Sequence, residues 1–264
     1  MTYNCSDKNE WRKPDTRIKT FIRNLTLTFL VIAGIFSGAA AQTDSAMQTK
    51  LSRTQQYLIP VAAITAQGNL SKLKPQLAAA LDAGLTVNQL KETIVHLYAY
   101  CGFPRSIRGL QTLMAVLEER KAKGITDVQG REASPITDSR SKYDRGKEVL
   151  GKISGASQDG PKTGYAAFSP EIEIFLKEHL FADLFERDVL SYAERELVTI
   201  SVLSSIGGVE PMLRSHLDIC LNVGISPAQL REFTAIITST IGEKEAKAAQ
   251  EVVDQVLKSK EPAK

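Results

Sequence analysis

The sequence predicts an all-α fold made of two tandem copies of one helical repeat, and three observations support this prediction. Residues 68–102 align without a gap on residues 208–242, with nine identities that include the glycines at both ends. Helix-capping boxes recur in both copies, each ahead of apolar residues at helical spacing. No segment alternates apolar and polar residues over a length that would indicate a strand. A repeat of this length indicates a duplicated structural unit.

The first copy is predicted to contain three successive helices. Residues 52–55 (Ser-Arg-Thr-Gln) form a capping box, in which the hydroxyl accepts a hydrogen bond from a free backbone amide, so the first helix begins there. Leucines recur every fourth residue from 73 to 81 and predict a second helix that stops at Gly84, a residue suited to a left-handed cap. Residues 86–89 (Thr-Val-Asn-Gln) form another box and begin the third helix.

The second copy repeats this order of signals. Residues 191–194 (Ser-Tyr-Ala-Glu) form its first capping box, leucines recur from 213 to 221, and Gly224 ends that helix. Residues 226–229 (Ser-Pro-Ala-Gln) form its second box, with Pro227 at the first helical position, where its missing N–H costs nothing. Each copy is therefore expected to be a compact group of capped helices.

A stretch rich in glycine and polar residues separates the two copies and sets the predicted domain boundaries. The first repeat is expected at residues 42–125, the linker at 126–142 and the second repeat at 143–260. The second repeat is longer at its front than the first.

Two further helices are predicted at the front of the second repeat. Residues 143–154 have the pattern of a short helix. A longer helix is expected to end at Leu184, with Ser169 as its cap and Pro170 at its first position.

Residues 1–41 are predicted to be a secretory signal peptide and not part of the fold. Lys19 and Arg23 precede an apolar run at 25–36, and small residues follow up to Ala41. This order is typical of exported proteins, so cleavage near Ala41 and a periplasmic or secreted location are expected. A membrane anchor is the alternative, but the apolar run of 12 residues falls short of the roughly 20 that a spanning helix needs.

The charge balance argues against a nucleic-acid-binding protein. The whole chain carries a formal net charge of +3, and the leader holds six basic and three acidic residues, so the mature chain is neutral. A neutral chain without a basic run lacks the electrostatic surface that nucleic acids require. No membrane association is expected after the leader is removed.

The cysteines and histidines of the mature chain show no metal or redox motif. Cys101 and Cys220 are not part of a Cys-x-x-Cys pair, and the three histidines lack metal-ligand spacing. The two thiols either form a disulfide, as an oxidising compartment permits, or remain as buried free thiols. No metal and no cofactor are expected.

Several segments resemble the carboxymuconolactone decarboxylase family, which includes the alkyl hydroperoxide reductase D peroxidases. The two most specific segments are residues 96–104 (His-Leu-Tyr-Ala-Tyr-Cys-Gly-Phe-Pro) and residues 195–199 (Arg-Glu-Leu-Val-Thr). Further similar segments lie in the second repeat, at residues 143–146, 168–170, 187–190 and 216–217. The resemblance implies an all-α protein whose subunits form rings, so that a tandem chain would assemble as a homotrimer that mimics a hexamer.

The resemblance also implies roles for Glu196 and His216, because the matching glutamate and histidine of family members face the pocket. A histidine beside a carboxylate acts as a general acid or base, since its unperturbed pKa is about 6.5. A histidine that only satisfies a core contact is the alternative. Peroxidase members carry a Cys-x-x-Cys pair ahead of this histidine, whereas Val209 and Met212 stand there in this chain. Without two thiols, the dithiol peroxidase cycle cannot run at that place.

Four further residues are candidates for the site. His96 and Tyr100 are expected at i and i+4 on one helix face, where they would hydrogen-bond a carboxylate or enolate oxygen, and core packing is the alternative. Cys101 is a candidate for substrate contact or for a reactive thiol. Arg187 would clamp a substrate carboxylate, and a surface ion pair is the alternative.

The two copies differ in a complementary way at four of these positions. The counterparts of Glu196, His216, His96 and Tyr100 in the other copy lack the same chemistry: they are Tyr57, Gln76, Ile236 and Thr240, respectively. We therefore expect one composite pocket for each pair of repeats, formed within a chain or across a subunit boundary.

Three functions are compatible with this sequence. The leading hypothesis is an exported enzyme that acts on a small organic acid or lactone by acid–base chemistry, without a cofactor. The second hypothesis, from the redox class, is a thiol-dependent antioxidant protein that uses Cys101 or Cys220 as its peroxidatic thiol. The third is a small-molecule-binding protein that retains the scaffold but does not turn over its ligand.

Overall fold

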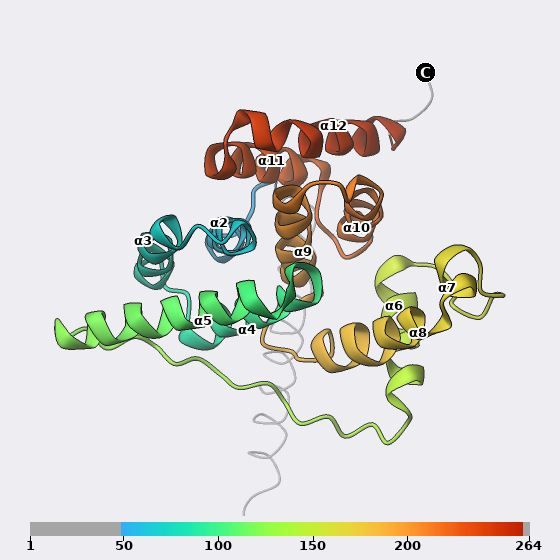
Figure 1. The fold of residues 1–264 in the computed structure, drawn as a ribbon, viewed down its shortest axis with the longest axis horizontal. Coiled ribbons are helices and arrows are strands. Elements are labelled where there is room, and N and C mark those ends of the chain that lie inside the picture. Colours follow the sequence, from blue (N-terminus) through green and yellow to red (C-terminus); the bar gives the residue numbers. More distant parts are fainter. Residues whose placement is uncertain (1–48, 261–264) are drawn as a thin grey trace, which may run out of the picture. The chain divides into compact units, whose positions relative to one another are not determined.

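The computed structural model describes residues 49–260, which are built from helices joined by loops (Figure 1). The predicted signal peptide at 1–41, with Cys5, lies outside the described residues. No strand occurs in the described part, so the all-α prediction is confirmed. None of the helices within residues 49–260 has both the length and the apolar character that crossing a bilayer requires.

The first repeat forms around two of the predicted capping boxes. Its helices are α2 (Arg53–Gln67), α3 (Leu70–Asp82), α4 (Val87–His96) and α5 (Tyr98–Ala122). Ser52 caps α2 and Thr86 caps α4, and in both boxes the glutamine three residues later returns a hydrogen bond to the cap. Gly84 has φ +96°, which confirms the predicted left-handed stop after α3.

The second repeat has the same four helices in the same order. They are α9 (Tyr192–Ile206), α10 (Glu210–Asn222), α11 (Pro227–Ile241) and α12 (Glu243–Ser259). Ser191 and Ser226 form the predicted capping boxes of α9 and α11, and Gly224 has φ +97° after α10. The tandem repeat of helical units is confirmed.

The front of the second repeat differs from the prediction in detail. It contains α6 (Lys142–Ser154), α7 (Gly164–Phe168), α8 (Pro170–Phe175) and the π-helix η1 (Leu176–Leu184). The helix α7 was not predicted, and the expected cap of α8 is wrong. Ser169 makes no hydrogen bond to the α8 backbone: its ψ is 89°, whereas the capping residues Ser52 and Ser191 have ψ 159° and 163°.

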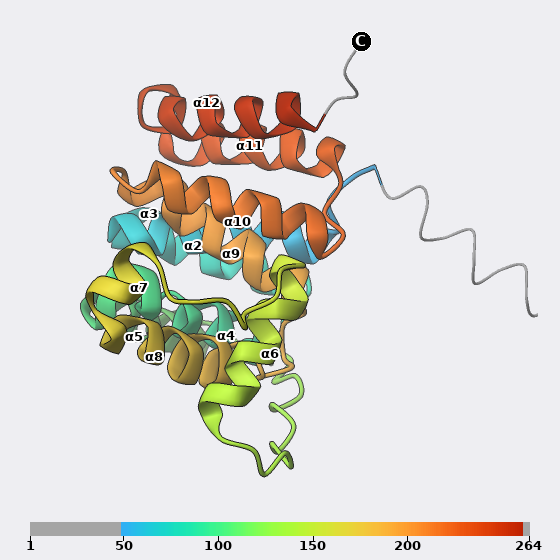
Figure 2. The same ribbon diagram turned by 90° about the vertical axis from the view of Figure 1, so that its right-hand side faces the viewer.

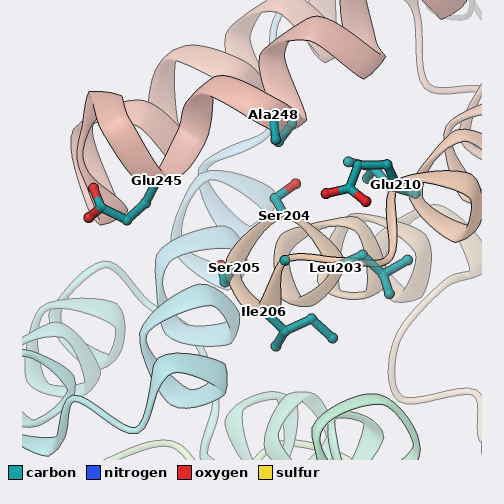
Figure 3. A pocket seen from close by; sticks show the side chains of 10 residues that line it. Leu203, Ser204, Ser205, Ile206, Glu210, Glu245 and Ala248 are labelled. Carbon is teal, nitrogen blue, oxygen red and sulfur yellow. The ribbon is translucent and has the colours of Figure 1, made fainter.

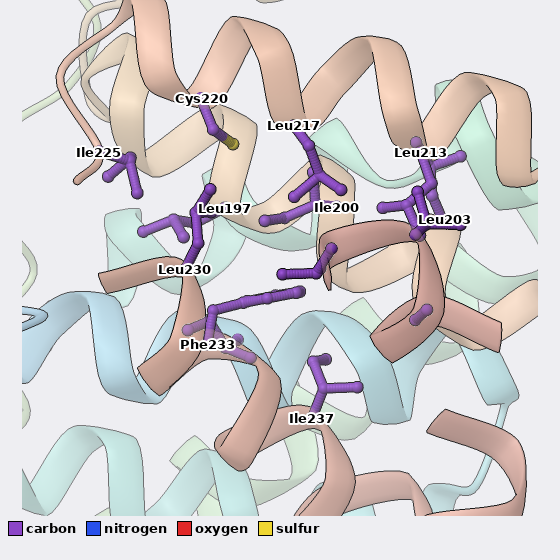
Figure 4. Packing of buried hydrophobic residues seen from close by; sticks show 14 of the residues in the cluster. Leu197, Ile200, Leu203, Leu213, Leu217, Cys220, Ile225, Leu230, Phe233 and Ile237 are labelled. Carbon is purple, nitrogen blue, oxygen red and sulfur yellow. The ribbon is translucent and has the colours of Figure 1, made fainter. Parts of the chain in front are cut away.

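The two repeats share their cores through the central helices α2 and α9, which pack against each other (Figure 2). In the second repeat, residues of α9, α10 and α11 such as Leu197, Leu217 and Phe233 surround Ile200 (Figure 4). Ile59 of α2 belongs to this same cluster. In return, Val198 and Val202 of α9 pack into the core of the first repeat. Each repeat therefore depends on the other for part of its buried surface.

The helix α9 combines this apolar packing with five buried polar side chains, three of which bear on the candidate site. Every residue of α9 from Arg195 to Ser204 is buried, and among them Arg195, Glu196 and Thr199 are fully enclosed. Burying a charged or polar group costs free energy unless it finds a partner. The partners of these three side chains define the candidate site.

Candidate active site

Glu196 and His216 form a hydrogen-bonded pair between adjacent helices. Glu196 lies one turn inside α9 and is fully buried, while His216 lies on α10 with its side chain 14% exposed. The distance from His216 Nδ1 to Glu196 Oε2 is 2.7 Å. A carboxylate at Nδ1 fixes the orientation of the imidazole ring and leaves Nε2 available for proton transfer. This geometry is suited to a general acid or base.

The first repeat contributes His96 and Tyr100 to the same place. The Tyr100 ring lies edge-on to the His216 ring with centroids 5.8 Å apart, and its centroid is 5.4 Å from that of His96. The four residues therefore meet within one chain and come from both repeats. We call them the four-residue cluster.

One detail of the sequence expectation for this cluster is wrong. His96 and Tyr100 do not share one continuous helix, because α4 ends at His96 and α5 begins at Tyr98. Their rings still approach each other, since the break at Leu97 keeps helical backbone angles.

The surroundings of His96 settle which of its nitrogens carries the proton. Its Nδ1 lies 3.3 Å from Nη1 of Arg195, and its Nε2 lies 2.9 Å from the Thr199 hydroxyl. A guanidinium only donates hydrogen bonds, so Nδ1 accepts and Nε2 carries the proton. Burial and the nearby Arg195 charge lower the pKa of His96 well below its usual value. His96 is therefore a neutral hydrogen-bonding residue at neutral pH.

A buried ion pair between the repeats supports His96. Arg195 donates from Nη2 to Glu92 Oε1 at 2.7 Å, and both side chains are almost fully buried. Arg187 donates from Nε to both oxygens of Glu92, at 2.9 and 3.0 Å. Arg195 also donates to the backbone carbonyl of Arg187. One carboxylate from the first repeat thus accepts hydrogen bonds from two arginines of the second.

Sequence reasoning missed three residues of this arrangement: Glu92, Arg195 and Thr199. A signal was present for Glu92, because it is one of the identities between the two repeats. Arg195 and Thr199 stand in the segment that carries the family resemblance, but nothing local showed that they face His96.

Two buried oxygen atoms of the four-residue cluster have no hydrogen-bond partner. They are the Tyr100 hydroxyl and Glu196 Oε1. Most buried polar atoms in proteins are satisfied, so each such exception calls for an explanation. Burial and the Glu196 charge raise the pKa of Tyr100 strongly, so Tyr100 is a neutral phenol that can donate a hydrogen bond. A polar ligand atom beside these groups would satisfy both of them.

The predicted substrate-binding residues Arg187 and Cys101 lie in different surroundings. The Arg187 side chain is 41% exposed and is paired with Glu92, as in the ion-pair alternative. Cys101 lies next to Tyr100 and lines an open cleft. Their roles in substrate binding stay predictions.

The environments of both thiols disfavour a peroxidatic cysteine. Cys101 and Cys220 are free thiols and not joined in a disulfide. Partial burial raises the pKa of Cys101 to about 11, and burial with the nearby Glu196 charge raises that of Cys220 well above its usual value. The reactive species is the thiolate, which is scarce at neutral pH when the pKa is raised. In the described chain, no three His, Cys, Asp or Glu side chains converge in a way that would hold a metal ion.

Comparisons with known proteins agree with this architecture. Residues 36–114 and 170–255 match the sequence profile of the carboxymuconolactone decarboxylase family, one match in each repeat, and together they cover more than half of the chain. A 4-carboxymuconolactone decarboxylase from Acinetobacter baylyi is 27% identical over 118 residues. These residues make up 44% of this chain and 87% of that enzyme.

Proposed function

This chain belongs to the carboxymuconolactone decarboxylase family, and from that premise we propose that it removes a carboxyl group from a small organic acid or lactone. The four-residue cluster would supply the acid–base chemistry, with His216 and Glu196 as the proton-transferring pair. The relative from Acinetobacter baylyi supports a carboxylated lactone as the first substrate to test.

The observation that carries this proposal is the pair of unsatisfied oxygen atoms beside His216. Tyr100 presents an unbonded hydroxyl, and Glu196 presents an unbonded carboxylate oxygen. A structural core would satisfy such groups or replace them with apolar ones, whereas a substrate site must leave donors and acceptors free for the ligand.

The chemistry required for decarboxylation matches these groups. When the carboxyl group leaves as CO₂, the electron pair of the broken C–C bond moves into a neighbouring carbonyl and forms an enolate. Tyr100, a neutral phenol, would donate a hydrogen bond to the enolate oxygen. His216, held by Glu196 at 2.7 Å, would then act as the general acid that delivers a proton to the carbon, and water would return that proton to the imidazole.

The test is turnover of 4-carboxymuconolactone by the purified protein, followed as CO₂ release. We expect His216→Gln, which introduces the amide found at its counterpart Gln76, to lower kcat by about 100- to 10,000-fold because the proton donor is lost. His179→Gln is the matched control, since His179 is half exposed and bonds only Asp183 at 3.0 Å.

Two outcomes would contradict the proposed function. If the wild-type protein binds the lactone but releases no CO₂, the chain is a binding protein for this ligand. If instead it reduces a hydroperoxide at a rate that Cys101→Ser or Cys220→Ser abolishes, the redox hypothesis holds.

We also propose that the protein is exported, on the basis of the charged, apolar and small residues in 19–41. N-terminal sequencing of protein from the periplasmic fraction would test this, with Gln42 expected as the first residue. An uncut chain confined to the cytoplasmic fraction would contradict export.

We further propose that the chain assembles as a homotrimer. Exposed apolar side chains on α5 and beside α8 support self-association, including Phe103 (62% exposed) and Phe168 (92% exposed). Light scattering after size-exclusion chromatography should give the mass of three chains, and a monomer mass would contradict the proposal.

A further inference from the structure

A cleft of about 710 Å³ opens at the boundary between the two repeats, next to the four-residue cluster. The C-terminal end of α2, the beginning of α5 and the C-terminal end of α9 contribute to its walls. Tyr100 lines this cleft and also contacts the rings of His96 and His216. Tyr100 therefore belongs both to the wall of the cleft and to the cluster.

Arg105 is the one charged side chain among the residues that line this cleft. No ion pair in residues 49–260 involves Arg105. Arg187, the other arginine considered for a substrate, already pairs with Glu92. An arginine without a carboxylate partner at the mouth of a cleft can bind a ligand carboxylate through paired N–H donors.

The guanidinium of Arg105 packs directly against the backbone of Gly68. A Cβ atom at Gly68 would lie only 1.4 Å from Arg105 Nη1, so a side chain there would displace the guanidinium. Gly68 also has φ +69°, which other residues rarely adopt. The close contact with this glycine restricts where Arg105 can point.

The second repeat provides an internal comparison, because the counterpart of Arg105 is Glu245. The counterpart of Tyr100 is Thr240, so the charge at this position is reversed in the repeat that lacks the tyrosine. Glu245 lines a smaller pocket at the end of α9 together with a second acidic residue, Glu210 (Figure 3). Of the two equivalent positions, only the one beside the four-residue cluster carries a positive charge.

We propose that Arg105 binds a carboxylate of the substrate in this cleft and selects carboxylate-bearing small molecules for the site. The proposal rests on the proposed function for the identity of the site, but it concerns binding and not the chemical step. Arg105 is therefore a specificity-determining residue that acts before proton transfer.

The experiment compares the binding of 4-carboxymuconolactone and of its methyl ester by isothermal titration calorimetry. The proteins are the full-length wild type, Arg105→Gln, Arg105→Lys and the matched control Arg108→Gln. Arg108 is exposed on the same helix, one turn further on, and its Nη1 bonds Gln111. Thermal unfolding of each variant checks that the fold is retained.

We expect Arg105→Gln to weaken binding of the acid by about 10- to 100-fold, because a charge-assisted hydrogen bond is lost. Binding of the ester should not change in any variant. The affinity of Arg105→Lys for the acid should lie between those of the wild type and Arg105→Gln, and Arg108→Gln should bind the acid like the wild type. Equal binding of the acid by wild type and Arg105→Gln would overturn the proposal. So would a wild type that binds the acid no better than the ester. A preference for the acid without any CO₂ release would contradict the proposed function alone.

Discussion

The two repeats use an equivalent glutamate in different ways. In the first repeat, Glu92 is buried and accepts a hydrogen bond from Arg195 Nη2 at 2.7 Å. At the equivalent place in the other half, Glu232 accepts one from Gln56 Nε2 at 2.9 Å. The same contact between repeats is thus made twice, once as an ion pair and once with a neutral amide. Both repeats therefore keep the hydrogen bond to the glutamate, but only the one to Glu92 comes from a charged side chain.

The surroundings of the two contacts explain why the charge is needed only once. Arg195 also donates a hydrogen bond to His96, so its charge acts on an imidazole of the four-residue cluster. Gln56 has no such neighbour, because the counterpart of His96 is Ile236. Glu232 instead accepts a hydrogen bond from the backbone amide of Leu51 at 2.7 Å, which anchors the start of α2. One contact supports chemistry and the other fixes a chain segment.

The largest expected effect concerns this pair of glutamates. Glu92→Gln leaves Arg195 buried without an opposite charge, so we expect the free energy of unfolding to fall by about 3–5 kcal/mol. Glu232→Gln keeps an acceptor for Gln56 and removes no charge partner, so a loss of about 1 kcal/mol is expected. Urea unfolding of both variants provides the measurement. Equal losses would show that the two contacts do not differ in kind.

A smaller effect, on activity alone, is expected for Tyr100. Removing its hydroxyl in Tyr100→Phe should lower kcat by about 100- to 1,000-fold, as for other donors to a developing oxyanion. The free energy of unfolding should not fall, because this buried hydroxyl has no partner in the protein. Tyr98→Phe, on the same helix and stacked on Phe103, is the control. A loss of stability without a loss of activity would make Tyr100 a packing residue.

The smallest effect is a pH dependence that arises from His96 of the first repeat. The pKa of His96 is lowered in the folded protein, so below about pH 6.5 the unfolded chain binds a proton that the folded chain does not. His96 therefore favours the folded state above pH 6.5, and this contribution is lost as the pH falls. We expect a slope of up to about 1.4 kcal/mol per pH unit between pH 6.5 and 5.5.

Urea unfolding of wild type and His96→Gln across pH 7.5 to 5.5 measures this slope. The variant should show a shallower dependence, since position 96 no longer titrates. Identical slopes would mean that His96 is protonated in the folded protein as readily as in the unfolded one.

The elements that depend on neighbouring residues could be predicted from the sequence, whereas the contacts between distant residues could not. The capping boxes at Ser52 and Ser191 act within three residues, so local reading located them correctly. The cap expected at Ser169 failed because its backbone has ψ 89°, unlike the extended angles of the capping serines, and no local sequence signal shows this. Comparison of the repeats did identify complementary residues such as His96 and His216, because duplication supplies a second sequence to compare.

The ion pair between Arg195 and Glu92, next to His96, is an example of a contact that the sequence alone could not predict. Arg195 and Glu92 are about a hundred positions apart, and their contact depends on how α4 packs against α9. The same holds for Thr199, whose hydroxyl faces His96 only after the central helices have packed. Nothing in the spacing of these residues distinguishes them from an ordinary helix surface.

The exchange of core residues between α2 and α9 has a consequence for how such a chain can be shortened. A fragment that ends after α5 would leave Ile59 without the Leu197 cluster, and a fragment that begins at α9 would leave Val198 uncovered. Neither half is then an independent folding unit, although only one carries the proton-transferring pair. We therefore expect a chain shortened to one repeat to need the other repeat, supplied as a second polypeptide, to cover its exposed core.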